Sequence, residues 1–305
     1  MDYVFLLRKI LVALCDVFRW RDRKQGMTLV MTIQAKNEED VLEQNIRFHK
    51  AMGVDGFIIT DNDSTDGTGR IIEKYKRKGW VWESILEKGK DHRQKIWVDR
   101  MIWLAKTKFG ADWIIDADAD EFWYTPSGNL KEVLAKASAN VLTCRSISMY
   151  PEEGKPLEEW DKAVRVIDRP EDYGLSRYPV FVGQIPKVAH KAKGYIQISS
   201  GNHKVIMFPK RKRSCPDIWI YHYNIRGKGQ FMRKMVDGGK ALALNPSKHG
   251  GRHWRYFYGL HQQGLLEAEY DKVVGKNCYG RLVDEGLIYE DGRMAAFFRS
   301  LNREA

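Results

Sequence analysis

Short apolar runs alternate with amphipathic stretches through the first half of the chain. The runs predict buried strands because polar turn residues bound them, and the stretches predict helices because apolar residues recur every three or four positions. The predicted strands occupy residues 28–33, 57–60, 113–116 and 141–147. The predicted helices occupy residues 37–52, 66–79, 92–109 and 130–137, with Asn37 as the cap of the first. This order predicts an α/β fold with a doubly wound, mostly parallel sheet.

The pattern becomes irregular after residue 150, where prolines interrupt it repeatedly. Short strands are expected at residues 195–198, 205–208 and 218–223. A helical pattern then runs from Gln230 to about residue 244, and the tail to Ala305 is expected to be mostly helical. The chain is therefore expected to end in a helical C-terminal region.

The N-terminal residues 1–26 have the pattern of an amphipathic helix. Its apolar positions are Leu6, Leu7, Ile10, Leu11, Leu14, Val17 and Phe18, and the basic residues Arg19, Arg21, Arg23 and Lys24 follow them. The unbroken apolar run of residues 10–14 is far below the roughly 18 residues that a membrane span needs. Two interpretations stay open: a helix lying on an anionic membrane, or a helix packed on the protein's own core.

The composition is that of a basic globular protein. Hydrophobic residues make up 43% of the 305 residues, and the net charge is +11. This charge favours an anionic partner such as a nucleotide or an acidic lipid, although a merely well-solvated surface would have the same composition. The four cysteines are widely spaced and form no C-x-x-C pair. That spacing argues against a cysteine-based zinc site and fits a reducing, cytosolic compartment.

Three polar clusters follow predicted strands directly, at residues 34–39, 61–68 and 116–121. The carboxyl ends of parallel strands meet at one edge of a sheet, where ligands bind in open α/β folds. The third cluster places four carboxylates within six residues: Asp116, Asp118, Asp120 and Glu121. Such crowding of negative charge requires a cation or solvent. The pattern therefore predicts a divalent metal held by oxygen ligands and presented to a phosphate-bearing substrate.

Each cluster also matches another class of site when it is taken alone. Asp61-x-Asp63-x-Thr65 resembles the signature of haloacid-dehalogenase phosphatases, in which the first aspartate is the nucleophile. The spacing after Asp116 resembles the start of an EF-hand loop, but Glu121 and Ser127 stand where Gly and Glu are needed. The P-loop motif of kinases and NTPases does not occur in the sequence. A phosphatase, or a non-catalytic basic protein that binds membrane or nucleic acid, remains an alternative function.

Together, the motifs resemble glycosyltransferase family 2, which has the GT-A fold, and most of all its bacterial branch related to glycosyltransferase family 92. Residues 36–39 and 61–68 resemble the motifs after the first two strands, and residues 118–122 resemble the D-x-D metal motif. Residues 201–203 and 221–226, with Gln230, Phe231 and Lys234, resemble the C-terminal signature of the branch. The resemblance covers about residues 28 to 240. One departure is Asn62-Asp63, where many family members have Asp-Gly.

The resemblance implies a metal-dependent, inverting, hexosyltransferase-like glycosyltransferase. Such an enzyme would move a sugar from a UDP- or GDP-linked donor to a glycan or polysaccharide acceptor, and no nucleic-acid partner is expected. The implied domains are the N-terminal helix (1–26), a GT-A domain (27–229) and a C-terminal helical extension (230–305). The GT-A domain would consist of a nucleotide-binding half (27–125) and an acceptor half (126–229). The implied location is the cytoplasm, on the inner face of the membrane if residues 1–26 attach there.

The resemblance also assigns roles to individual residues. Asp118, Asp120 and Glu121 would be catalytic, and Asp118, Asp120 and His222 would bind Mn²⁺ or Mg²⁺. His203 is the second choice for the histidine ligand. Asp118 and Asp120 are two positions apart, so in an extended chain their side chains would point the same way.

The donor site and the base complete the expected residues. The donor-binding residues would be Gln34, Lys36, Asn37, Asp61, Asp63, Arg93, Arg226 and Lys234. Asp61 is expected to contact the base or ribose of the donor, and Lys95 is an alternative to Arg93. An inverting transfer needs a base for the acceptor hydroxyl. Asp217 and His203 are candidates for this base by their position in the chain alone.

Overall fold

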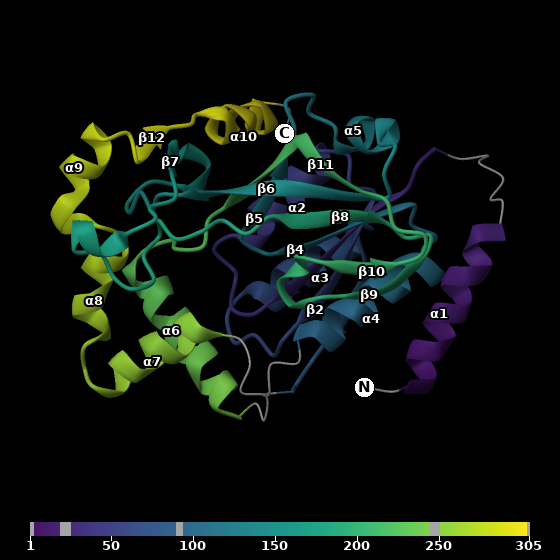
Figure 1. Cartoon of the computed structure of the whole chain (residues 1–305), viewed down its shortest axis with the longest axis horizontal. Helices are drawn as coiled ribbons and strands as arrows, with labels where there is room; N and C mark the ends of the chain where they lie inside the picture. The colour runs from purple at the N-terminus through teal and green to yellow at the C-terminus, as the bar shows by residue number, and fades with distance from the viewer. Residues whose placement is uncertain (1–2, 19–25, 90–93, 245–250, 304–305) are drawn as a thin grey trace. The chain divides into compact units, whose positions relative to one another are not determined.

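The computed structural model describes residues 3–18, 26–89, 94–244 and 251–303, which form two compact units (Figure 1). Unit 1 consists of Met1–Lys88, Arg93–Ser146 and Ile185–Ile220. Unit 2 consists of Gly89–His92, Ile147–Gln184 and Tyr221–Ala305. Each unit is described by itself. The domain boundaries expected at residues 26, 125 and 229 stay predictions.

A four-stranded parallel sheet forms the centre of unit 1, in the order β4-β1-β2-β3. Its strands are β1 (Leu29–Ala35), β2 (Gly56–Asp61), β3 (Val81–Leu86) and β4 (Trp113–Asp118). The helices α2 (Leu42–Ala51), α3 (Thr68–Arg77) and α4 (Gln94–Thr107) connect them. β1, β2 and β4 are almost entirely buried, as expected for parallel strands covered on both faces. The predicted α/β class and the parallel core are therefore confirmed.

Antiparallel strands extend the sheet beyond β4. β8 (Lys187–Lys191) pairs with β4, and the first residues of β6 (Val141–Met149) pair with β8. β5 (Glu121–Tyr124) pairs with β11 (Lys212–His222), which also pairs with β6. β9 (Tyr195–Ile198) and β10 (Val205–Met207) form a separate hairpin, and α5 (Leu130–Lys136) precedes β6. The apolar runs did not predict β5 and β8, although both contribute to the site described below.

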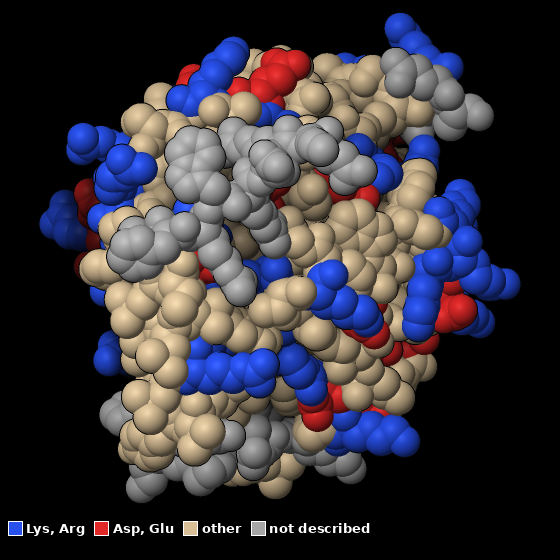
Figure 2. Space-filling view, turned by 90° about the vertical axis from the view of Figure 1, so that its right-hand side faces the viewer, with Lys and Arg blue, Asp and Glu red and all other residues tan. Residues whose placement is uncertain are grey.

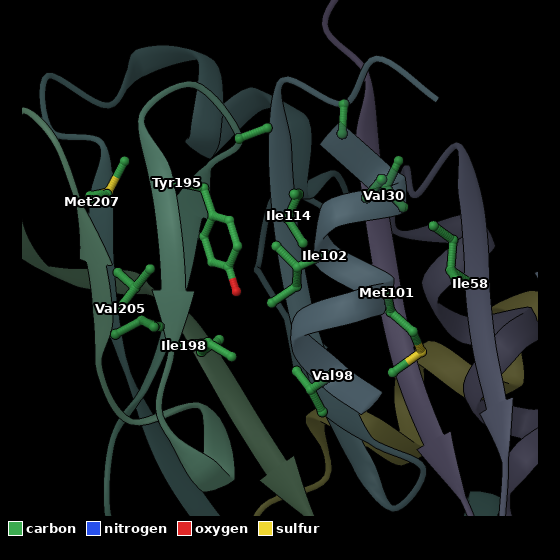
Figure 3. Packing of buried hydrophobic residues seen from close by; sticks show 14 of the residues in the cluster. Val30, Ile58, Val98, Met101, Ile102, Ile114, Tyr195, Ile198, Val205 and Met207 are labelled. Carbon is green, nitrogen blue, oxygen red and sulfur yellow. The ribbon is translucent and has the colours of Figure 1, made fainter. Parts of the chain in front are cut away.

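The core of unit 1 lies between α4 and the sheet. The apolar residues of α4 recur every three or four positions, so they form one stripe that packs on the strands. Burying each such side chain contributes about 1.5–3 kcal/mol. Figure 3 shows this packing for Val30, Ile58, Val98, Met101, Ile102, Ile114 and Tyr195.

Unit 2 is mainly helical among its described residues. Its helices are α6 (Lys228–Leu244), α7 (Arg252–Gln262), α8 (Leu266–Val273), α9 (Tyr279–Asp284) and α10 (Arg293–Arg303). β7 (Lys162–Val164) pairs with the end of β6 and with β12 (Ile288–Glu290). The aromatic side chains of Phe181, Phe231, Phe257 and Tyr270 form much of its core. The expected helical C-terminal region is therefore confirmed.

The N-terminal helix α1 (Tyr3–Phe18) belongs to unit 1. It contacts β9, and its side chains reach α4. In the part of the chain that the structure describes, no helix combines the length and the apolar character needed to cross a membrane.

Candidate functional site

The three polar clusters of the sequence meet at one edge of the parallel sheet in unit 1. In the register of the sheet, Ala35 of β1 lies opposite Asp61 of β2, and Gln34 lies opposite Asp118 of β4. The predicted convergence of the strand ends is therefore present in the structure. Gln34 is half-buried, and its Oε1 has no hydrogen-bond partner within the described residues.

The loops after β1 and β2 are bound to each other through Asn37. Its backbone N–H donates to Ser64 Oγ at 3.0 Å, and its Oδ1 accepts from the backbone N–H of Thr65 at 2.8 Å. Asn37 has a φ of +52°, a conformation that asparagine tolerates better than most residues. The expectation that Asn37 caps a helix is wrong, because α2 begins at Leu42 with Val41 at its N-cap.

Two other predicted donor residues take part in the same pair of loops. Lys36 Nζ donates to the backbone carbonyl of Asp63 at 2.6 Å. Asp61 Oδ1 accepts from the backbone N–H of Ser64 at 3.0 Å. Lys36 and Asp63 are exposed, whereas Asp61 is half-buried. The hydrogen bonds fix the shape of this loop pair, and the exposed side chains remain accessible at its surface.

A tight turn separates the two aspartates of the D-x-D motif. Ala119 and Asp120 form the turn between β4 and β5, so the chain is not extended there. Asp118 lies at the end of β4 with 41% of its side chain exposed, whereas Asp120 is only 1% exposed. The expectation that an extended chain aligns the two side chains is therefore wrong. Asp118 is the aspartate of this motif that a ligand can reach directly.

A buried lysine lies between Asp118 and Glu121. Lys187 Nζ, from β8, is 2.8 Å from Asp118 Oδ2 and 2.6 Å from Glu121 Oε1. Burial alone would lower the pKa of Lys187, but the two carboxylates outweigh it and raise the pKa above its ordinary value. Glu121 Oε2 also accepts from the backbone N–H of Asp118 at 3.2 Å. Lys187 therefore supplies the cation that the carboxylate cluster was expected to need.

Asp116 differs from its neighbours because it is buried inside the sheet. Burial raises its pKa to about 7, with Asp118 and Glu121 adding to the shift, while Thr32 and Lys187 oppose it. Thr32 Oγ1 donates to Asp116 Oδ1 at 2.6 Å. Asp116 Oδ1 thus already has a hydrogen-bond partner inside the protein. The expectation that the strand ends at Asp116 is wrong, because β4 continues to Asp118.

Two buried side chains of α2 hold the turn in place. Asn45 Nδ2 donates to the backbone carbonyls of Ala119 at 2.8 Å and Glu121 at 2.9 Å. His49 Nε2 accepts from the backbone N–H of Trp123 at 2.9 Å, and His49 Nδ1 donates to Asn45 Oδ1 at 2.8 Å. This pattern requires the neutral imidazole with its proton on Nδ1. Burial lowers the pKa of His49 to about 3, in keeping with that form.

His203 is the histidine that unit 1 places beside these carboxylates. Its Nδ1 is 3.1 Å from the carbonyl of Pro186, and it is half-buried. Burial and the charge of Lys187 lower its pKa, while Asp118 opposes this shift. A Cβ on Gly201 would lie 2.7 Å from His203 Nε2, so a side chain at this position would collide with the imidazole. Neighbouring Asn202 donates from Nδ2 to the backbone carbonyl of Asp116.

The other predicted ligands lie in unit 2 or outside the described residues. His222 is the last residue of β11, and Lys234 lies on α6. The backbone N–H of Arg226 donates to Gln230 Oε1 at 3.0 Å, and its Nη1 donates to the carbonyl of Tyr223 at 3.0 Å. Arg93 lies outside the described residues. The roles of these four residues stay predictions.

The fit of a divalent cation depends on Asp118. A carboxylate oxygen is the ligand type that Mg²⁺ and Mn²⁺ prefer. Among the described residues, no group of three or more His, Cys, Asp or Glu side chains is arranged to hold a metal ion. The residues thus fit a cation that takes one ligand from Asp118 and most of the others from the phosphates of a bound donor, as Mg²⁺ often does.

The sequence motifs did not predict the roles of Lys187, Asn45 and His49. Lys187 lies on an unpredicted strand, and nothing in its neighbourhood in the sequence marks it. Asn45 and His49 fall four positions apart on a predicted helix, a spacing that places them on one face. Two polar residues on the buried face of a helix were therefore the one feature of the sequence that could have indicated a structural role for Asn45 and His49.

The chain is similar in sequence to a glycosyltransferase family 92 protein of Arabidopsis thaliana. The two are 23% identical over 220 residues, which cover 69% of this chain and 34% of the relative. The chain thus spans about a third of the length of that curated relative. The match confirms the resemblance to family 92 that the motifs indicate. No protein-family model matches the chain.

Solved structures with a distant likeness include a mannosyltransferase and a protein crystallised with UDP. TarS of S. aureus in complex with UDP is 11% identical, with a TM-score of 0.41 over 75% of this chain and 68% of that one. The mannosyltransferase PcManGT of Pyrobaculum calidifontis, in complex with GDP-Man and Mn²⁺, is 14% identical, with a TM-score of 0.41 over 99% of this chain and 94% of that one. At these TM-scores, no residue role in the present chain follows from the likeness.

Proposed function

We propose that this protein is a glycosyltransferase that moves a sugar from a nucleoside-diphosphate donor to a glycan acceptor. The observation that carries the proposal is the meeting of three polar loops at one sheet edge, with the accessible Asp118 carboxylate at the end of β4. The sequence similarity to a family 92 protein supports the same class of reaction.

The donor would lie along the loops after β1 and β2. Gln34 Oε1 is an acceptor that an N–H of the nucleotide base would satisfy, and Asp61 is placed to accept from a ribose hydroxyl. Lys36, Asn37 and Asp63 shape the rim of this pocket through their shared hydrogen bonds. Arg93, Arg226 and Lys234 are the proposed partners of the diphosphate, because guanidinium and ammonium groups pair with phosphate oxygens.

The acidic turn would hold the leaving diphosphate. Negative charge grows on that group as the sugar–phosphate bond breaks. A Mn²⁺ or Mg²⁺ ion held by Asp118 would supply a Lewis acid for this charge. Of the other two ligands expected from the sequence, Asp120 is only 1% exposed, so His222 is the one that remains to be tested. Lys187 holds Asp118 and Glu121 in position before the donor arrives, so little reorganisation is needed.

An inverting transfer would need a base for the acceptor hydroxyl, and we propose His203 for this role. It lies in the same unit as Asp118, close enough for the two charges to influence each other. The other candidate, Asp217, is exposed on β11. His203→Asn should lower kcat without weakening Mn²⁺ binding, whereas His222→Asn should weaken Mn²⁺ binding. If His203→Asn instead weakened Mn²⁺ binding and His222→Asn lowered only kcat, His203 would be the metal ligand and His222 the base.

We propose that the protein acts at the cytoplasmic surface of an anionic membrane. The cysteines Cys15, Cys144, Cys215 and Cys278 are all free thiols, which fits a reducing compartment. The acceptor is proposed to be a glycan or a growing polysaccharide.

A thermal-shift screen of nucleotides tests the donor site. UDP or GDP with Mn²⁺ should raise the melting temperature of the wild-type protein, and the Asp118→Asn variant should lose this response. Glu132→Gln, an exposed carboxylate on α5, is the matched control and should respond like the wild type. A protein that releases phosphate from phosphomonoesters and loses this activity in Asp61→Asn would instead be a phosphatase.

A further inference from the structure

The side of α1 that faces the protein contains two charged side chains beside apolar ones such as Phe5 and Ala13, and the side that faces outward is mostly apolar. Lys9 is buried, with an exposed fraction of 2%, and Asp16 is largely buried at 13%. Leu7 and Leu11, by contrast, are 60% and 62% exposed. Helices at protein surfaces normally bury their apolar stripe and expose their charges. The outward side of α1 therefore lacks the polar character expected for a helix that only covers the core.

Two reciprocal ion pairs fix this orientation. Lys9 pairs with Asp99 of α4, and Asp16 Oδ2 pairs with Lys106 Nζ of the same helix at 2.6 Å. The partners are seven positions apart on both helices, so the two helices lie side by side in parallel with matched charges. Asp16 Oδ2 also accepts from the backbone N–H of Gly194 at 2.9 Å. Turning α1 about its axis would leave four charges largely buried without partners, which is strongly unfavourable.

The outward side of α1 therefore stays apolar. Its exposed residues are Tyr3, Val4, Leu7, Arg8, Leu11, Leu14 and Cys15. These positions recur every three or four residues and form one continuous stripe. A continuous exposed apolar surface on a folded protein usually has a binding partner.

Two described basic residues lie on or near this stripe. Arg8 lies on the stripe itself, and Lys95 is exposed on α4, close enough to influence Lys9 electrostatically. Figure 2 shows this side of the molecule, where Lys and Arg side chains are interspersed among uncharged residues together with some Asp and Glu.

The hairpin that α1 contacts adds further residues of both kinds. Ile206 of β10 is 57% exposed, and Phe208, just after it, is 49% exposed. The exposed basic residues 210–213 follow. A second copy of the chain would bring the same positive charges together, whereas an anionic lipid surface would complement them.

We propose that the outward side of α1 is a docking surface for an anionic phospholipid membrane. The leucines would enter the boundary between headgroups and acyl chains, and the basic residues would contact the headgroup phosphates. The ion pairs between α1 and α4 would keep the membrane-bound helix attached to the rest of unit 1. The proposal does not depend on the reaction, because membrane binding can be measured without a donor or an acceptor.

Vesicle flotation of the full chain tests the proposal. Wild-type protein should bind vesicles of phosphatidylcholine and phosphatidylglycerol, bind phosphatidylcholine alone more weakly, and lose affinity as salt is added. The double variant Leu7→Asp/Leu11→Asp should lower the partition coefficient by a factor on the order of 100. Its melting temperature should stay that of the wild type, because both side chains are exposed.

The matched control is Leu265→Asp, which changes an apolar residue that is 50% exposed in unit 2. This variant should float with the vesicles as the wild type does. Wild-type protein that stays off anionic vesicles, or a double variant that binds them equally well, would overturn the proposal. A concentration-dependent dimer that the double variant abolishes would identify a second copy of the chain as the occupant instead.

Discussion

Lys187 Nζ lies 2.6 Å from Glu121 Oε1, and the exposed fractions of these two side chains are only 7% and 1%. The pair connects β8, in the antiparallel part of the sheet, to β5, which follows the acidic turn. A buried pair of this kind is costly to break, because the remaining charge has neither water nor a partner.

Replacing the lysine alone should therefore destabilise the protein severely. Lys187→Met should lower the free energy of unfolding by about 3–5 kcal/mol, measured by urea denaturation. The double variant Lys187→Met/Glu121→Met should recover part of this loss, because no buried charge is left over at these two positions. A Lys187→Met protein as stable as the wild type would contradict the importance of the pair.

Asn45 should matter for activity more than for folding. In Asn45→Ala, two buried carbonyls of the acidic turn lose their donor, at a cost of about 1–3 kcal/mol. The freed turn should also misplace Asp118, so donor turnover should fall at least about tenfold at a temperature where the variant is folded. Steady-state kinetics beside a melting curve separate the two effects.

The control for Asn45 lies next to it on the same helix. Ile46→Val removes one methyl group from the buried face of α2, at a cost of about 0.5–1.5 kcal/mol. It should leave turnover unchanged, since Ile46 makes no hydrogen bond to the turn. Equal losses of turnover in both variants would show that Asn45 acts only through stability.

His49 should make the stability of the protein depend on pH. Its pKa is lowered to about 3 in the folded protein, against an ordinary value of 6.5, so the unfolded chain takes up a proton first as the pH falls. The stability that the neutral imidazole contributes is complete above pH 6.5 and is lost as the pH falls towards 3, by at most about 1.4 kcal/mol per pH unit.

Urea denaturation at several pH values measures this dependence. His49→Gln should unfold with a smaller loss of stability between pH 6.5 and pH 4 than the wild type, and His261→Gln, on an exposed position of α7, should behave like the wild type. Buried His190, whose pKa is lowered to about 4, remains in all three proteins and cancels in the comparison. Identical pH profiles of wild type and His49→Gln would count against the neutral, buried imidazole.

The sequence predicted those parts of the fold that depend on local periodicity. The apolar runs around Ile58 and Ile114 predicted buried parallel strands, and the polar clusters after them predicted the edge where the site lies. The pairing between β4 and β8 was not predictable in this way. It depends on a contact between residues about 75 positions apart, such as Ile115 and Ala189, which no local pattern encodes.

In the candidate site, too, local motifs could be predicted from the sequence, whereas long-range contacts could not. Asp118 and Asp61 were recognised because short motifs surround them. Lys187 was missed because its role comes from tertiary packing against two carboxylates. The difference in exposure between Asp118 and Asp120 was also missed. Their spacing suggests that the two side chains are equally accessible, but the two-residue turn between β4 and β5 exposes Asp118 and buries Asp120.

The most direct test of the central claim is sugar transfer itself. The wild-type protein should release UDP or GDP from a panel of nucleotide sugars in the presence of Mn²⁺, either to water or to an added glycan. Asp118→Asn should reduce this release at least about a hundredfold at a temperature where a melting curve shows that the variant is folded, since Lys187 keeps its ion pair with Glu121. Release that is absent in the wild type across the whole panel, or unchanged in Asp118→Asn, would contradict the assignment.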